Sequence, residues 1–189
     1  MSLDRLWAPW RLDYVTGNES GAVALPEPAD WPPGAERECF LCRAAATYDE
    51  DAQADRQLLV ADRARHTIVV LNRYPYNNGH LLVAPRRHVG ELGDLSPEEH
   101  LECMWQLGRL TRVFRECLNA EGFNIGLNLG RVAGAGLPGH LHWHLVPRWN
   151  GDNNFMTVLA GTRVIPQSLD ALWELLVGAL EKESLRHAE

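Results

Sequence analysis

Residues His140–Trp149 read HLHWHLVPRW and carry the most regular pattern in the chain. Successive side chains of a β-strand point to opposite faces of the sheet, so His140, His142 and His144 fall on one face. The apolar residues between them fall on the other face and can be buried against a core. The run therefore predicts a half-buried strand over Leu141–Pro147 that presents a row of imidazoles on its second face.

Other strands are predicted where short segments rich in Val, Leu and Ile are bounded by turn residues. They are Gln57–Ala61, His66–Leu71, His80–Ala84 and Phe123–Leu129, with a further short strand near Thr157–Leu159. Short connections such as the predicted turn Asp62–Arg65 and the loop Asn72–Gly79 favour antiparallel pairing of neighbouring strands.

The clearest helix begins after Ser96. Ser96 and Glu99 have the spacing of a capping box, and Pro97 occupies the first helical position. Apolar residues then recur at helical spacing up to Gly122, which is predicted to end the helix. A second amphipathic helix is predicted over residues 168–185.

These elements predict an α+β fold, with a roughly five-stranded, mainly antiparallel sheet, one long inserted helix and a C-terminal helix. Residues 1–38 carry Trp7, Trp10 and Trp31 and a proline-rich stretch, and we expect an irregular segment that packs on the core or on a partner subunit. Residues 39–189 are predicted to form a single domain.

Composition narrows the class of function. The 189 residues are 46% hydrophobic and 23% charged, and the net charge of −7 comes without a block of Lys or Arg. A nucleic-acid partner is therefore not expected. No window is long and apolar enough for a membrane span, and the start MSLDRLWAPWR lacks the order of a signal peptide, so we expect a cytoplasmic protein.

Two chemistries use several histidines on one face. One is zinc-dependent hydrolysis, in which histidines hold a metal with an open position for water. The other is nucleophilic catalysis at phosphorus, in which a neutral imidazole attacks and a second imidazole assists the leaving group. The glycine-rich loop upstream favours phosphorus chemistry, because Gly134 and Gly136 let backbone N–H groups approach phosphate oxygens and Asn128 could add a donor.

Cys39 and Cys42 form a CxxC pair, which in a cytosolic chain indicates a metal pair or a redox pair. Two thiolates and two histidines would make a tetrahedral Cys₂His₂ zinc site. Cys103 and Cys117 fall within the predicted helix, about 20 Å apart along its axis, and we interpret both as small core residues.

The segments HLHWHLV, LNRYPYNNGHLLVAP, GFNIGLNLG and the N-terminal LWAPWR together resemble the histidine-triad family, in particular its longer bacterial members, the diadenosine tetraphosphate phosphorylases and their relatives. The resemblance runs from about Cys39 to Trp149. It implies that His142 is the nucleophile that attacks the α-phosphorus and becomes nucleotidylated. It also implies that His144 contacts the phosphate and the bridging oxygen.

The same resemblance implies the remaining substrate contacts. Asn72 matches the position that holds the ribose hydroxyls, and Asn128 with the loop at Gly134 and Gly136 matches the phosphate-binding segment. A homodimer, a nucleotide substrate and no organic cofactor are implied as well. Many hydrolase members carry Ser, Thr or Gln just before the triad, where this chain has Gly136–Gly139, so the resemblance does not choose between water and phosphate as acceptor.

A zinc site is also implied. Some triad proteins, and the related hexose-1-phosphate uridylyltransferases, bind zinc through such a cysteine pair, and the other ligand positions match His88 and His140. His140 would then be structural, and His142 and His144 would face the substrate.

Several functions remain open on the sequence. The leading hypothesis is a nucleotidyl hydrolase or transferase acting on dinucleoside polyphosphates. The alternatives are a nucleoside phosphoramidate hydrolase, a nucleotidyltransferase to a sugar phosphate, a metal-dependent hydrolase, and a zinc-stabilised nucleotide-binding module without turnover.

Overall fold

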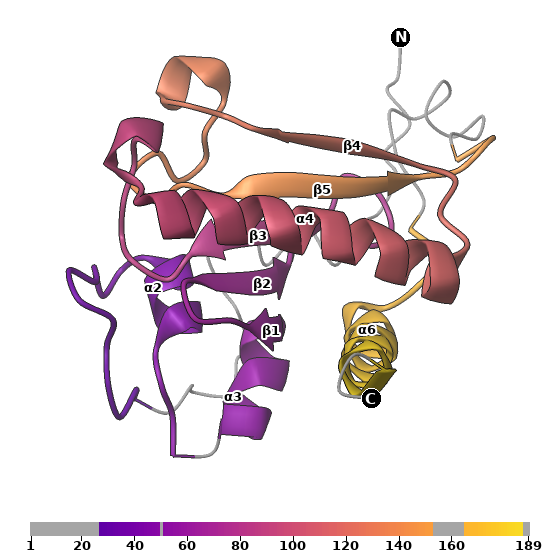
Figure 1. The fold of residues 1–189 in the computed structure, drawn as a ribbon, viewed down its shortest axis with the longest axis horizontal. Helices are drawn as coiled ribbons and strands as arrows, with labels where there is room; N and C mark the ends of the chain where they lie inside the picture. The colour runs from indigo at the N-terminus through magenta and orange to yellow at the C-terminus, as the bar shows by residue number, and fades with distance from the viewer. Residues whose placement is uncertain (1–26, 50, 153–164, 187–189) are drawn as a thin grey trace, which may run out of the picture.

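The computed structural model describes residues 27–49, 51–152 and 165–186, and a five-stranded sheet forms the centre of this part of the chain (Figure 1). The strands are β1 (Val60–Arg63), β2 (Thr67–Leu71), β3 (Leu81–Pro85), β4 (Gly122–Leu127) and β5 (Trp143–Arg148). Their order is β1-β2-β3-β5-β4, and every neighbouring pair is antiparallel. The predicted α+β fold with a mainly antiparallel sheet is confirmed.

The histidine strand β5 lies between β3 and β4. His144 is paired with Leu82 of β3 on one side and with Gly126 of β4 on the other. β5 begins at Trp143 and not at Leu141 as predicted, because the Leu141 N–H donates to the carbonyl of Val89 (2.7 Å). His140 and His142 therefore lie in the segment that leads into the strand.

Helix α4 (Pro97–Leu118) lies along one face of the sheet, nearly parallel to β5 (Figure 1). The capping box is present in full, since the Glu99 N–H donates to the Ser96 hydroxyl and the Ser96 N–H donates to the Glu99 carboxylate. Leu107, Leu110 and Phe114 are buried on the sheet side. The predicted end at Gly122 is wrong: Asn119 adopts a left-handed conformation (φ 51°) and ends the helix, and Gly122 opens β4.

Helix α6 (Leu169–Arg186) confirms the predicted C-terminal helix. It buries Leu172, Leu176 and Leu180, which repeat every four residues and so share one face. That face packs on α4 and β1. None of the helices in the described ranges is long and apolar enough to cross a membrane.

Two helices were not predicted, α2 (Phe40–Ala45) and α3 (Asp51–Leu58). The predicted strand Gln57–Ala61 is wrong in its first half, because Gln57 and Leu58 end α3. Leu59, with φ at 60°, then turns the chain into β1. The predicted strand near residues 157–159 and the first 26 residues lie outside the described part of the chain, and the division between residues 38 and 39 stays a prediction.

Candidate active site

His142 is held by its own neighbour in the triad. Its Nδ1 lies 2.8 Å from the backbone carbonyl oxygen of His140. A carbonyl oxygen can only accept, so Nδ1 of His142 carries the proton and donates it, and Nε2 keeps a lone pair. The side chain is 9% exposed, and its ring lies edge-on to His144 at 5.1 Å between centroids. The nitrogen left with the lone pair is the one that a nucleophile needs.

His144 is held by a histidine from the neighbouring strand. Nε2 of His80 lies 2.9 Å from Nδ1 of His144. The backbone N–H of Tyr76 donates to Nδ1 of His80 (3.1 Å), so the proton of a neutral His80 ring sits on Nε2 and is donated to His144. Neutral His144 then carries its own proton on Nε2. The Tyr76 N–H thus donates to His80, His80 donates to His144, and the Nε2–H of His144 is the donor at the end of this series of hydrogen bonds.

Burial keeps His80 and His144 neutral. His80 is 1% exposed, and burial lowers its pKa to about 3, with smaller contributions from the charges of His144 and His142. Burial also lowers the pKa of His144, and His142 adds to the effect. The Tyr76 ring stacks on His80 at 4.7 Å and lies 5.9 Å from His144, and it forms an exposed rim over the pair.

Asn72 follows β2 and belongs to the same cluster. Its amide nitrogen lies 3.2 Å from Nδ1 of His80, and its amide oxygen accepts from the N–H of Tyr74. The residue predicted to hold a ribose is thus fixed against the histidine pair. The pairing of β3 with β5 is what brings His80, the residue before β3, to His144.

The predicted phosphate loop lies beside the triad. Asn128 follows Leu127, whose strand partner is Trp143, and its amide nitrogen donates to the carbonyl of Gly134 (3.4 Å). Gly134 has φ at 90°, a conformation that side chains other than glycine rarely adopt. Gly136 is exposed, with open space where a side chain would be. The loop is therefore accessible to a ligand and held from one end by Asn128.

A second cluster lies behind the triad. Cys39 and Cys42 from α2 and the turn before it meet His88 and His140, and their ligand atoms all lie within 4.8 Å of one another. The sulfur–nitrogen distances are 3.3 Å for Cys39 to His140, 3.2 Å for Cys42 to His88 and 3.5 Å for Cys42 to His140. A tetrahedral zinc with ordinary bond lengths sets this edge at roughly 3.6 Å. The donor set and its spacing fit a metal ion.

In both histidines of this cluster, Nδ1 faces the cysteine sulfurs and is available to bind a metal. Nε2 of His140 donates to the carbonyl of Pro85 (2.8 Å), which leaves the Nδ1 lone pair facing the two sulfurs. Nε2 of His88 lies 3.4 Å from the Glu36 carboxylate, while its Nδ1 faces Cys42. Outer hydrogen bonds of this kind orient histidine ligands. His140 is fully buried and belongs to this cluster, although its carbonyl holds His142.

Burial also shapes the protonation of the cluster. It raises the pKa of the Cys42 thiol to about 12, and it lowers the pKa of His140 to about 4 against a smaller opposing effect from Pro85. His140 is therefore neutral, as a metal ligand must be. Without a metal, the Cys42 thiol would keep its proton at neutral pH. Binding of a cation to the sulfur would displace that proton.

Comparison with known proteins agrees with this geometry. A family model described as the HIT domain matches residues 44–151, and the chain belongs to the HIT family. An AP-4-A phosphorylase of Mycobacterium tuberculosis is 42% identical over 168 residues, which span 88% of this chain and 79% of the relative. An asymmetrical bis(5'-nucleosyl)-tetraphosphatase of Schizosaccharomyces pombe is 33% identical over 90 residues, covering 48% of this chain and 49% of that protein.

Among solved structures, a zinc-bound histidine triad family protein from Mycobacterium smegmatis is similar in both sequence and fold. It shares 32% identity, with a TM-score of 0.56, over 69% of this chain and 88% of its own. The chain is thus similar in sequence to two enzymes, and it is similar in both sequence and fold to a zinc-bound protein.

Proposed function

We propose that this chain is a nucleotidyl hydrolase or transferase acting on dinucleoside polyphosphates, with His142 as nucleophile. One observation carries the proposal. Nδ1 of His142 donates to the His140 carbonyl, which leaves the lone pair on Nε2, and His142 lies next to the hydrogen-bonded pair of His80 and His144. A metal-dependent mechanism is less well supported, because His140 turns into the cysteine cluster and does not join the other two histidines.

The chemistry follows from these two assignments. Nε2 of His142 attacks the α-phosphorus, a P–N bond forms, and the bond from phosphorus to the bridging oxygen breaks. The ring becomes a phosphorylated imidazolium whose charge is stabilised by the His140 carbonyl, while Nε2–H of His144 donates to the departing oxygen. An acceptor then attacks the phosphorus, the P–N bond breaks, and His142 returns to its neutral form.

Phosphate is the acceptor that we propose first. The similarity to the mycobacterial AP-4-A phosphorylase, at 42% identity over most of both chains, supports it. Gly136, with open space where a side chain would be, leaves room on the loop before the triad for a second anion to reach the adduct. Water as acceptor is the second candidate, supported by the similarity to the fission-yeast tetraphosphatase.

One nucleoside of the substrate is proposed to occupy a cleft of about 580 Å³ that is lined by Arg73, the residue after Asn72. Gln57 of α3 and Leu169 at the start of α6 also line this cleft. A volume of this size is typical of small-molecule sites. Asn72 would hold the ribose between the cleft and the histidines, and Asn128 with Gly134 and Gly136 would hold the phosphates.

A structural zinc ion is part of the proposal, held by Cys39, Cys42, His88 and His140. When bound, it would tie α2 to the segment that leads into β5 and so fix the His140 carbonyl. A homodimer is proposed as well, because β4 is an edge strand of the sheet in the described residues, and Ile125 within it and Leu129 after it are exposed. The four free cysteines agree with the proposed location in the reducing cytoplasm.

Product analysis with diadenosine tetraphosphate tests the function directly. We expect ATP and ADP from the wild type when phosphate is present, and ATP and AMP would identify water as acceptor. His142→Ala should abolish both reactions, whereas His100→Ala, on α4 with its ring bonded to the Leu92 carbonyl, should not. A wild-type protein that yields neither product pair, or full turnover in His142→Ala, would overturn the proposal.

The covalent step has its own test. A substrate labelled at the α-phosphorus should leave acid-labile, base-stable label on wild-type protein and on His100→Ala, and none on His142→Ala. Phosphoramidates and sugar phosphates offered in parallel distinguish the alternative substrates. Protein that binds nucleotide without ever becoming labelled would be a binding module.

A further inference from the structure

A second cavity lies where β3 ends, next to the turn between β1 and β2. It has a volume of about 340 Å³ and is lined by Trp31, Ala45 at the end of α2, the turn residues Arg65 and His66, and the residues that follow β3. His80 precedes β3 and Arg86 follows it, so the five residues of β3 separate them by about 20 Å, whereas His140 bonds the carbonyl of Pro85 at the Arg86 end. No residue of the triad is among those that line the cavity.

The charges that line the cavity do not cancel. Arg65, Arg86 and Arg87 line it, against Asp30 and Glu99. Glu99 is already matched, because both of its oxygens accept from Arg87 (3.1 and 2.9 Å) and one also accepts from the Ser96 N–H. Of the acidic residues that line the cavity, this leaves Asp30 opposite Arg65 and Arg86. Outside the lining, Glu98 lies near Arg65, and the Glu102 carboxylate already accepts from the His66 N–H (2.8 Å).

The Arg86 side chain is held in place by a backbone carbonyl, which carries no charge to offset that of the guanidinium. Its guanidinium donates to the carbonyl of Ala45 (3.1 Å), and its backbone N–H donates to the carbonyl of His66 (2.8 Å). A guanidinium has five N–H donors, so most of its capacity is left over. In the part of the chain that the structure describes, neither Arg65 nor Arg86 has a carboxylate within ion-pair distance, and Arg65 makes no side-chain hydrogen bond.

Two more arginines lie close to the ring of Trp31, which lines the cavity. The guanidinium carbons of Arg37 and Arg43 lie 5.9 and 5.5 Å from the ring of Trp31. Neither of these arginines has an ion pair with a described carboxylate. A concave surface with positive groups around a low-dielectric wall concentrates anions, whatever the net charge of the chain.

We propose that this cavity is a second, non-catalytic anion site that binds the diphosphate or polyphosphate group of a small ligand. The planar forks of Arg65 and Arg86 match phosphate oxygens, and each can bind them in a bidentate manner. His66 stands between the two arginines and adds a further polar edge. Free pyrophosphate and the phosphate tail of a nucleotide share this chemistry, and both fit the volume.

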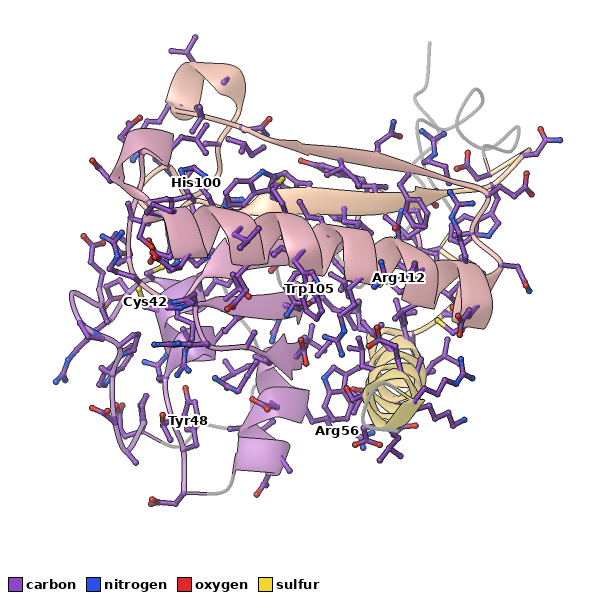
Figure 2. The ribbon with its side chains drawn as sticks, in the orientation of Figure 1. Cys42, Tyr48, Arg56, His100, Trp105 and Arg112 are labelled. Atoms are coloured by element: carbon purple, nitrogen blue, oxygen red, sulfur yellow. The ribbon has the colours of Figure 1, made fainter. Side chains whose placement is uncertain are left out.

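The test uses a signal that belongs to the cavity. Full-length, zinc-loaded protein labelled with ¹⁵N gives an indole N–H resonance for Trp31, which is assigned as the peak that is missing in Trp31→Phe. Titration with pyrophosphate should shift this resonance to saturation, and Arg65→Gln should weaken the binding about tenfold. Arg112→Gln is the matched control, because Arg112 is an exposed arginine of α4 away from the cavity (Figure 2).

Arg65→Gln removes no side-chain hydrogen bond to a residue that the structure describes, and an unchanged melting temperature checks that it folds normally. ATP and adenosine are titrated in parallel. A shift with ATP as well as pyrophosphate assigns the site to nucleotide tails too, whereas pyrophosphate alone assigns it to the free anion. The proposal is overturned if the Trp31 resonance does not move, if adenosine moves it as strongly as ATP, or if Arg65→Gln binds like the wild type.

Discussion

Nε2 of His80 donates to Nδ1 of His144 across two paired strands, at 2.9 Å. This bond decides which nitrogen of His144 faces outward with a proton. Because the Tyr76 N–H blocks the other nitrogen of His80, a neutral His80 has one arrangement available and not two. His80 is therefore a positioning residue for His144.

Replacing His80 should slow the chemical step more than it weakens substrate binding. We expect His80→Ala to lower kcat about 10- to 100-fold with a small change in KM, since losing a fixed acid–base partner removes part of a contribution of that order. His80→Gln, whose amide can still donate near the Nε2 position, should recover part of kcat. Steady-state kinetics of both variants check this, and an unchanged kcat in His80→Ala would contradict the role.

The same residue predicts how stability changes with pH. The pKa of His80 is about 3 in the folded chain, against 6.5 for a histidine in the unfolded chain, so below pH 6.5 the unfolded chain takes up a proton that the folded chain refuses. The free energy of unfolding should therefore fall as the pH drops, by about 1 to 2 kcal/mol between pH 6.5 and 5 from this group. Denaturant titrations of wild type and His80→Gln measure it. Equal pH slopes for the two proteins would show that His80 does not contribute.

Removal of one cluster ligand should remove the metal. Elemental analysis of protein purified without chelator is expected to find about one zinc per chain, as a four-ligand structural site requires. Cys42→Ala and His88→Ala should lose zinc and melt at lower temperature. Cys103→Ala is the control, because Cys103 is equally buried but lies in α4, and it should keep the metal. Metal-free wild-type protein, or full retention in His88→Ala, would refute the site.

Gly90 fixes the loop before the triad. A Cβ on Gly90 would lie 2.9 Å from the carbonyl oxygen of Pro138, closer than real side chains approach. Gly90→Ala should destabilise the chain by about 1 to 3 kcal/mol and raise KM, because the loop must move. Gly93→Ala is the control. A Cβ on Gly93 would lie in open space, so this variant should have neither effect. Thermal melts with kinetics decide, and equal behaviour of the two variants would contradict this account.

Arg109 joins α4 to two other elements. It lies 2.7 Å from Asp62 of β1 and 2.6 Å from Glu183 of α6, and its side chain is almost fully buried. Arg109→Met should lower the free energy of unfolding by about 2 to 4 kcal/mol, because Asp62 and Glu183 each lose an ion pair with a buried guanidinium. Activity per folded molecule should stay the same. Arg112→Met on the exposed side of α4 should change stability by less than about 0.5 kcal/mol. Similar losses in both variants would argue against the network.

The parts of the fold that could be predicted are those with a local signal. The strand pattern of β5 and the capping box at Ser96 depend on neighbours in the sequence, and both elements are present in the structure. The predicted alternation of burial holds only at the start of β5, because Val146 and Pro147 are buried along with Leu145. Helices α2 and α3 have no such signal: α2 has six residues, and the apolar run after α3 favoured a strand that starts too early. The left-handed residue Leu59, which separates α3 from β1, has no mark in its residue type.

The site divides in the same way. His142 and His144 lie on one short run, so their spacing alone predicted that they belong together. His80 lies 62 positions before His142, and its role depends on how β3 pairs with β5, which no local pattern specifies. The cluster of Cys39, Cys42, His88 and His140 followed from the family resemblance, and the residues do come together.

The alternation of β5 has a consequence for how the gene can vary. Trp143 and Leu145 point into the core while His144 points to the active site, so one inserted or deleted residue in this strand would exchange the two sets. The active site would receive a tryptophan, and the core would receive an imidazole, in a single event. Insertions in the exposed loop Gly130–Gly136 would leave the strand in phase. Library screens that tolerate length changes should therefore recover them in that loop and never within β5.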